Sequence, residues 1–269
     1  MTSVDGGAPR WWGRPVAETR WMLEAARLAA DPVFVPVGVP RGDGRPVLLL
    51  PGFLAGDPTL GVMAGWLYRL GYAPRTCGFV ANADCSQRAL ERVERRAATL
   101  YERHGRRVAL LGHSRGGHLA RALAASGPEH VSHAISLGAD LQRMFGVSAL
   151  TMLAVAGARR GLHVTRRARN PACLTEACDC AFTRHYAAPF PRDQVRLTSI
   201  YSKGDGVVCW ERSIVPEADN VEVTGSHIGL IFNRKAYRAI AAALAQPELQ
   251  VSNISNSYKG SRVARTDPQ

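Results

Sequence analysis

The 269-residue sequence is short of several features that mark large protein classes. No apolar stretch reaches the ~18–20 residues that a membrane-spanning helix needs, so no such helix is expected. The first residues include Asp5 and lack the uninterrupted apolar region and small-residue cleavage site of a secretory signal. We therefore expect a cytoplasmic or peripherally membrane-associated protein.

Lysine is rare, since it supplies only 3 of the 34 basic residues, yet basic residues outnumber the 22 acidic ones and the net charge is +12. Such a charge attracts nucleic acid, anionic lipid or acidic substrates. However, the sequence contains no DNA- or RNA-binding motif and no basic run with interleaved aromatic residues. We interpret the charge as a basic, solvated surface and expect no nucleic-acid partner.

Six cysteines follow no familiar arrangement. Cys173, Cys178 and Cys180 form a C-x4-C-x-C cluster, which is not a known zinc pattern even if His185 supplies a fourth ligand. The alternatives are a disulfide, either Cys173–Cys178 or Cys173–Cys180, and buried free thiols. A disulfide would fit an oxidising compartment, whereas no export signal is visible. We expect no metal ion here.

Pro15–Ala30 mixes apolar and charged residues in the pattern of an amphipathic helix, with Glu18 and Glu24 among the charged positions. Two interpretations are open. The helix packs against the domain, which we favour, or it lies at a membrane interface together with the nearby Trp11, Trp12 and Trp21.

Short apolar runs alternate with amphipathic segments, which predicts a mostly parallel sheet with helices on both faces. The expected strands are Val47–Leu50, Arg75–Phe79, Val108–Gly112, Val131–Gly138, Val195–Tyr201 and Val221–Thr224. The expected helices are Thr59–Leu70, Cys85–His104, Gly116–Ala125 and Asn233–Ala245. We thus expect an N-terminal helical extension (1–46), one α/β domain (47–249) and a disordered tail (250–269).

The alternation is interrupted at about residues 140–191 by helix-like apolar stretches, arginine clusters and cysteines. Because this segment follows a strand, we predict a helical cap inserted over the carboxyl edge of the sheet. Its apolar stretch Val147–Gly157 suits an acyl chain, and equally suits a helix that packs on the sheet.

Ser114 is the central residue of Gly112-His113-Ser114-Arg115-Gly116, a G-x-S-x-G pattern between a predicted buried strand and a predicted helix. A serine nucleophile stands at the apex of such a strand-to-helix turn. Flanking glycines allow the turn without Cβ clashes, and the following helix directs its first amides toward a developing oxyanion. The pattern predicts Ser114 as a catalytic nucleophile.

A serine nucleophile needs a base that an acid holds in place, and in this architecture the acid precedes the histidine along the chain. Asp205 follows the fifth predicted strand and His227 follows the sixth, so both reach the same edge as Ser114. We predict Asp205 as the acid and His227 as the base. Asp140 is the rival acid, because it follows the fourth strand. The other histidines lie beside the serine, at the opposite edge or in the insertion.

Two backbone N–H groups are needed to bind the oxyanion. We predict that Arg115 supplies one, since it directly follows the nucleophile. The other is expected from Phe53 in the turn Pro51-Gly52-Phe53-Leu54 after the first strand, with Leu54 as the alternative.

These motifs resemble those of bacterial α/β-hydrolases of the esterase and lipase type, from about Val47 to Ala245. The resemblance rests on Leu50-Pro51-Gly52-Phe53, Gly112-His113-Ser114-Arg115-Gly116-Gly117, Asp205-Gly206-Val207-Val208 and Ser226-His227. It implies the α/β-hydrolase fold and hydrolysis of a carboxylic ester through an acyl-enzyme, without a cofactor. One departure is Pro51, where many lipases have His-Gly before the oxyanion residue.

The expected substrate is a lipid-like ester, because of the apolar insertion. The same site would also serve acyl transfer or the hydrolysis of thioesters or polyesters. A non-catalytic binding module with a hydrolase fold is the remaining alternative, against which an intact Ser, Asp and His argue. The sequence does not determine the oligomeric state.

Overall fold

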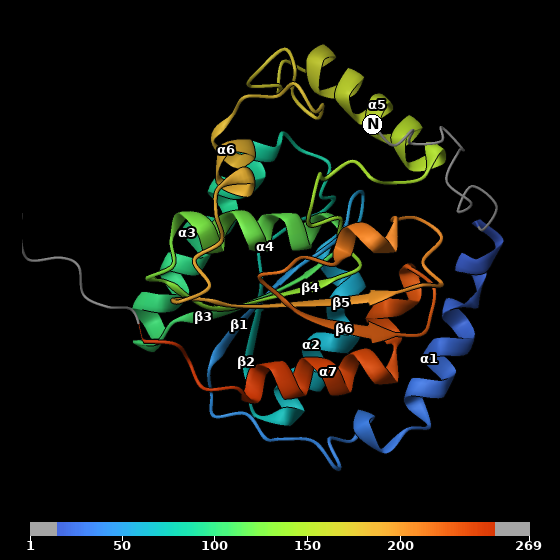
Figure 1. Ribbon diagram of the computed structural model, residues 1–269, viewed down its shortest axis with the longest axis vertical. Helices are drawn as coiled ribbons and strands as arrows, with labels where there is room; N and C mark the ends of the chain where they lie inside the picture. Colours follow the sequence, from blue (N-terminus) through green and yellow to red (C-terminus); the bar gives the residue numbers. More distant parts are fainter. Residues whose placement is uncertain (1–14, 251–269) are drawn as a thin grey trace, which may run out of the picture.

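In the computed structural model, which describes residues 15–250, six strands form one parallel sheet at the centre of the molecule (Figure 1). The order across the sheet is β2-β1-β3-β4-β5-β6. The strands are β1 (Pro46–Leu50), β2 (Ala73–Thr76), β3 (Val108–His113), β4 (Val131–Leu137), β5 (Arg196–Ser202) and β6 (Asp219–Val223). Every residue of β1, β3 and β4 is buried, as expected for apolar runs covered on both faces.

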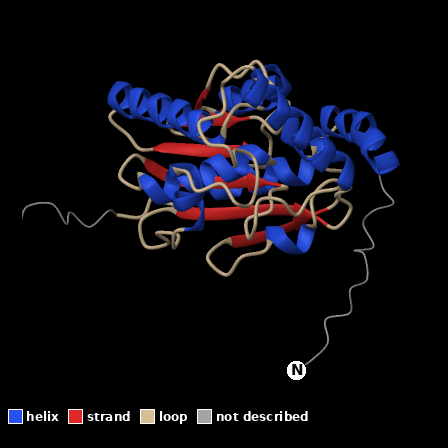
Figure 2. Cartoon of the chain, turned by 90° about the horizontal axis from the view of Figure 1, so that it is seen from above, coloured by secondary structure: helices blue, strands red, loops and turns tan. Residues whose placement is uncertain are grey.

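Helices cover both faces of the sheet, and the view from above shows the strands side by side among them (Figure 2). One face carries α3 (Ser86–His104) and α4 (Arg115–Ser126), and the other carries α2 (Gly61–Leu70) and α7 (Arg234–Ala245), with α1 (Trp21–Ala29) beside them (Figure 1). Two apolar clusters fill the two layers, one containing Leu90 and Leu123 and the other Trp66 and Tyr237. This arrangement confirms the predicted α/β-hydrolase fold.

Among the predicted elements that differ from the structure are the edge strand and the first helix. The edge strand β2 begins at Ala73, two residues before the predicted start, because its pairing with β1 runs from Ala73 to Thr76. The chain then turns away at Gly78, where φ is +78°. The predicted helix Pro15–Ala30 is a 3-10 segment, η1 (Pro15–Arg20), followed by α1. Leu28 of α1 is buried in the core, so this helix packs against the domain.

The segment between β4 and β5 carries two helices, α5 (Ala149–Val164) and α6 (Ala181–Ala187), as predicted for a helical cap. In Figure 1, α5 lies at the top of the molecule, beyond the layer of α3 and α4. Two ion pairs connect the cap to the domain below: Arg167 with Asp84 at 2.7 Å and Arg169 with Glu91 at 3.2 Å.

All six cysteines are free thiols, so of the two alternatives for Cys173, Cys178 and Cys180 the structure has buried free thiols and no disulfide. Cys173 instead packs with Cys85 of the domain in a small apolar cluster. A hydrogen bond from the Cys173 thiol lowers the pKa of Cys85 to about 5, while the pKa of Cys173 is raised. Among residues 15–250, no group of three or more His, Cys, Asp or Glu side chains is arranged to hold a metal ion.

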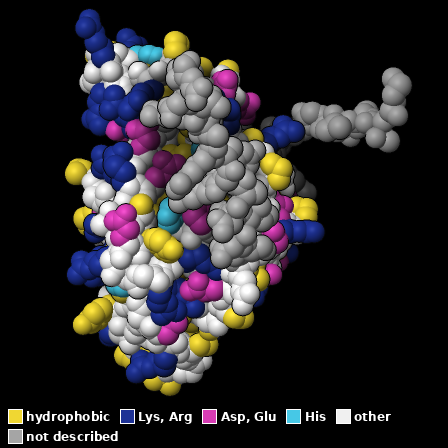
Figure 3. Space-filling view, turned by 90° about the vertical axis from the view of Figure 1, so that its left-hand side faces the viewer, with side chains coloured by type: hydrophobic (Ala, Val, Ile, Leu, Met, Phe, Trp, Pro, Cys, Tyr) yellow, Lys and Arg dark blue, Asp and Glu magenta, His cyan; other side chains and the backbone are white. Residues whose placement is uncertain are grey.

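On the face seen in Figure 3, Lys and Arg side chains are spread over much of the surface with acidic side chains between them. Within the described residues, no helix is both long and apolar enough to cross a bilayer. Trp11 and Trp12, the tryptophans of the alternative membrane-interface interpretation, lie outside the described residues. The predicted disordered tail also lies outside them, apart from residue 250.

Candidate active site

Ser114 lies in a sharp turn between the last residue of β3 and the first residue of α4. Its backbone has φ +52° and ψ −121°, a strained conformation that non-glycine residues rarely adopt. The Ser114 N–H donates a hydrogen bond to the carbonyl of Leu137 at 2.8 Å, which ties the turn to the end of β4. At Gly116, a Cβ would lie 2.1 Å from the Leu50 carbonyl, so glycine lets α4 start directly against β1.

His227 and Asp205 form a buried pair at the carboxyl ends of β5 and β6. The His227 Nδ1–H donates to Asp205 Oδ2 at 2.7 Å. The other carboxylate oxygen of Asp205 accepts the N–H groups of Val207 at 2.8 Å and Val208 at 2.7 Å. Both oxygens of the acid are therefore used, and the imidazole has its Nε2 on the opposite side of the ring from the acid.

The pair lies beside the serine turn. A Cβ on Gly138, at the end of β4, would lie 3.1 Å from Asp205 Oδ2 and 3.2 Å from His227 Nδ1. His113, the neighbour of Ser114, donates from Nε2 to the His227 carbonyl at 3.0 Å, and the two rings are 4.8 Å apart. The structure thus brings Ser114, Asp205 and His227 to one edge of the sheet.

The pKa of His227 is raised above its usual value. Burial opposes the charged imidazolium and lowers the pKa, but the carboxylates of Asp205 and Glu18 together outweigh burial. In contrast, burial lowers the pKa of His113 to about 3 and that of His118 to about 4. Those two rings are therefore neutral at physiological pH, whereas the surroundings of His227 favour taking up a proton.

Asp140, the rival acid, lies in a different hydrogen-bonded network. Its carboxylate accepts the N–H groups of Gln142, Arg143 and Gly146 at 2.7–3.0 Å, and Arg212 lies 3.6 Å away. It therefore shapes the first turn of the cap. The carboxylate that binds His227 is that of Asp205, and not that of Asp140.

Phe53 and Arg115 lie on either side of Asn82, a wholly buried residue that the sequence did not single out. The Asn82 side chain donates to the Pro51 carbonyl at 2.8 Å and accepts from Arg115 Nε at 3.2 Å. Its backbone pairs with the turn after β1 at Phe53, Leu54 and Ala55. The N–H of Arg115 belongs to the first turn of α4, where amides have no partner within the helix.

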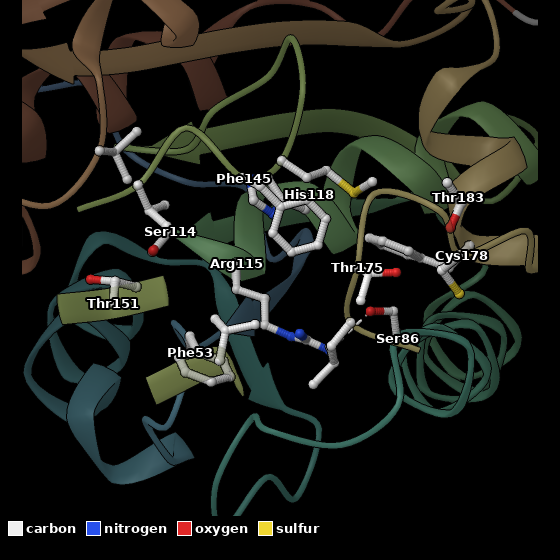
Figure 4. Close-up of a pocket in the computed structure, with 16 residues that line it drawn as sticks. Phe53, Ser86, Ser114, Arg115, His118, Phe145, Thr151, Thr175, Cys178 and Thr183 are labelled. Carbon is white, nitrogen blue, oxygen red and sulfur yellow. Dashed lines mark hydrogen bonds between the residues drawn. The ribbon is translucent and has the colours of Figure 1, made fainter. Parts of the chain in front are cut away.

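A cavity runs from Ser114 under the cap toward Cys178 and Thr183 (Figure 4). The domain side is formed by Phe53, Arg115 and His118, and the cap side mainly by apolar residues. The apolar lining residues of the cap are Met144, Phe145, Val147, Val155, Leu174 and Phe182, and the domain adds Phe53 and Val208. Neither His163 nor His185 of the cap is among the described residues that line it.

Burial also lowers the pKa of Arg115 to about 10, partly offset by Cys173, Cys85 and Asp84. Its guanidinium donates to the Asp84 carbonyl at 2.8 Å and lies over the Phe53 ring at 6.0 Å. The side chain of Arg115 is therefore held in place on the domain side of the cavity.

Glu18 and Glu24 contact the same edge, although their sequence pattern indicates only the charged side of an amphipathic helix. Glu18 accepts the N–H groups of Gly206, His227 and Ile228, and Glu24 binds Ser226. No local signal marks these contacts, because 188 to 210 residues separate the partners.

Comparison with known proteins identifies the family. The profile of the lipase (class 2) family matches residues 85–246. No curated protein sequence matches. Among solved structures, the mature lipase BlEst2 of Bacillus licheniformis superposes with a TM-score of 0.56 at 16% identity, covering 78% of this chain and 95% of that one.

Two further structures have similar folds. One, described with the metagenome-derived lipolytic enzymes LipS and LipT, has a TM-score of 0.52 at 15% identity and covers 77% of this chain and 94% of its own. The carboxylesterase CesB of Bacillus subtilis has a TM-score of 0.50 at 12% identity and covers 86% and 99%. At these identities the likeness shows the fold alone, whereas the profile spans more than half of the chain. The chain therefore belongs to the class 2 lipase family and is a carboxylic ester hydrolase with the α/β-hydrolase fold.

Proposed function

We propose that Ser114, His227 and Asp205 form a catalytic triad that cleaves the ester through an acyl-enzyme. The main support is the strained serine turn at the end of β3 beside the buried His227–Asp205 pair. His227 accepts the proton of Ser114 as its Oγ attacks the carbonyl, and then donates it to the leaving alcohol. Water activated by His227 releases the acid in the second half of the reaction.

The backbone N–H groups of Phe53 and Arg115 bind the oxyanion in this proposal. Both residues line the cavity together with Ser114, and Asn82 contacts both chain segments. Amides in fixed positions stabilise the tetrahedral intermediate without reorganising during the reaction. Pro51 takes part in this arrangement through its backbone carbonyl, which accepts the hydrogen bond from the Asn82 side chain.

The acyl part of the substrate is lipid-like in this proposal. The cavity beside Ser114 is lined by apolar side chains of the cap, mainly from α5, α6 and the segments next to them. Burial of each methylene of an acyl chain against such a wall contributes about 0.8 kcal/mol. Esters of longer acyl chains should therefore have higher kcat/KM until the chain exceeds the cavity.

The proposal is tested with p-nitrophenyl esters of increasing acyl length on wild type and Ser114→Ala. Loss of Ser114 should reduce turnover by roughly 10⁴–10⁶-fold, as at other triads. Ser126→Ala, at the far end of α4, is the matched control and should retain activity. A fluorophosphonate should label the wild type and fail to label Ser114→Ala. A folded Ser114→Ala enzyme with wild-type turnover would overturn the proposal.

We also propose that α1 contacts anionic membrane surfaces peripherally. Met22 is 61% exposed and Leu23 is 50% exposed, next to the partly exposed Trp21. Apolar residues flanked by Arg20 and Arg27, in a chain with net charge +12, suit an interface with anionic headgroups.

Co-sedimentation with vesicles tests this contact. Wild type should bind vesicles that contain phosphatidylglycerol and bind pure phosphatidylcholine less. The double variant Met22→Ser/Leu23→Ser should reduce binding several-fold, with ester turnover in solution unchanged. Tyr68→Ser, an exposed aromatic position on α2, is the control. Equal sedimentation of the double variant and wild type would contradict the proposal.

A further inference from the structure

One carboxylate of the N-terminal extension joins the two loops that carry the proposed acid and base. Glu18, in η1, accepts the N–H of Gly206 at 3.1 Å and the N–H of His227 at 2.9 Å through the same oxygen, Oε1. Its Oε2 accepts the N–H of Ile228 at 2.8 Å. Gly206 follows Asp205 directly, so both loops are tied to the same side chain.

A second carboxylate supports the histidine loop from the neighbouring helix. Glu24 of α1 is buried, and it accepts both the N–H and the hydroxyl of Ser226, at 2.9 Å and 2.8 Å. A Cβ on Gly229 would lie 1.3 Å from Glu24 Oε2, so only glycine leaves room for this carboxylate. The loop Ser226–Gly229 is therefore shaped around the extension.

Titratable groups from several elements lie around His227. Asp205 binds its Nδ1, Glu18 binds its backbone N–H, and the neutral ring of His113 binds its carbonyl. Glu24 binds Ser226, the residue directly before His227. Of these groups, Asp205 and Glu18 are the carboxylates that raise the pKa of His227. Loss of the charge on Glu18 should therefore lower that pKa.

We propose that Glu18 is a positioning residue, which sets the distance between the acid and base loops and favours the protonated imidazole that forms during the reaction. The inference rests on the proposed triad. It makes the N-terminal extension part of the catalytic machinery, although the family match covers only residues 85–246. Charge-assisted hydrogen bonds to three amides are strong enough to fix a loop.

The test compares Glu18→Ala and Glu18→Gln with wild type on one p-nitrophenyl ester, with active sites titrated by a fluorophosphonate. A misplaced base lowers the rate steeply, so Glu18→Ala should lower kcat per active site by about 10–100-fold with little change in KM. His227 must be neutral to accept a proton, so activity falls as the pH drops through its pKa. Loss of the Glu18 charge should move this acid limb to lower pH.

Glu18→Gln separates position from charge. Its amide oxygen can still accept the N–H groups of Gly206 and His227, so part of kcat should return. The acid limb should stay at the lower pH, because the charge is absent in both variants. Glu102→Gln, an exposed position on α3, is the matched control and should behave as wild type.

A purely structural role would lower the melting temperature and the titrated fraction only. Wild-type kcat per active site with an unmoved acid limb in both Glu18 variants would therefore overturn the inference. If Ser114→Ala is inactive while the Glu18 variants match Glu102→Gln, this inference fails and the proposed triad stands. If Ser114→Ala retains activity, the triad fails instead.

Discussion

Asn82 illustrates how a single buried polar side chain organises this site. It is wholly buried and connects the turn after β1, through Pro51, with the start of α4, through Arg115. Burial of a side-chain amide is unfavourable unless its hydrogen bonds are made. Asn82 therefore fixes the positions of its partners, and the partners fix the position of Asn82. The two proposed oxyanion amides belong to the two segments that it connects.

Replacement of this residue, Asn82→Ala, should leave the Pro51 carbonyl and the Nε–H of Arg115 without the partner that Asn82 supplies. We expect a loss of about 1–3 kcal/mol of unfolding free energy and a drop in kcat of about tenfold, less than removal of an oxyanion donor. Thermal unfolding and ester turnover measure the two effects. Asn220→Ala, in β6 and away from the cavity, should lose stability only. An Asn82→Ala enzyme with wild-type kcat would show that Asn82 does not set the oxyanion geometry.

At the scale of elements, the strand-to-helix unit β3–α4 determines where Ser114 lies. β3 lies between β1 and β4 in the middle of the sheet, so Ser114 emerges at its centre. The helix can start immediately after the serine because Gly116 packs against the Leu50 carbonyl. A larger residue would push α4, and with it the Arg115 amide, away from β1.

The substitution Gly116→Ala should therefore be damaging, since its Cβ would lie 2.1 Å from the Leu50 carbonyl. Overpacking of this kind costs about 1–3 kcal/mol of stability, and here it also displaces the serine turn. Gly65→Ala in α2 is the matched control, because its Cβ would meet only the end of Arg69 at 3.5 Å. That change should be neutral or stabilise by up to about 1 kcal/mol. Chemical denaturation checks both, and equal effects of the two substitutions would contradict the packing argument.

At the scale of the whole molecule, three parts of the chain meet above the carboxyl edge of the sheet. The domain supplies the serine, acid and histidine, the cap supplies the apolar side of the cavity, and the extension supplies Glu18 and Glu24. The cap is also fastened to the domain near the cavity by Arg167 and Asp84. In the two proposals, substrate selection and base positioning thus depend on segments outside the central sheet.

Most of the fold was predictable from the sequence, because burial on both faces produces short apolar runs and helices produce a 3.6-residue period. The predicted strands near Val108 and Val131 match β3 and β4 within one residue. The order of Ser114, Asp205 and His227 was also readable, since parallel strands bring their carboxyl ends to one edge. Their catalytic roles stay a proposal.

The remaining features depend on contacts between residues far apart in the chain, which leave no periodic pattern. Cys173 packs with Cys85 rather than forming a disulfide with Cys178 or Cys180, because the cap folds back over α3. Glu18 and Glu24 look like solvent-facing charges until α1 packs beside the loop of His227. The sequence by itself determined the sheet, the serine turn and the edge where the reactive groups lie. Only the tertiary structure decided which distant side chains hold those groups in place, because packing, and not local periodicity, selects them.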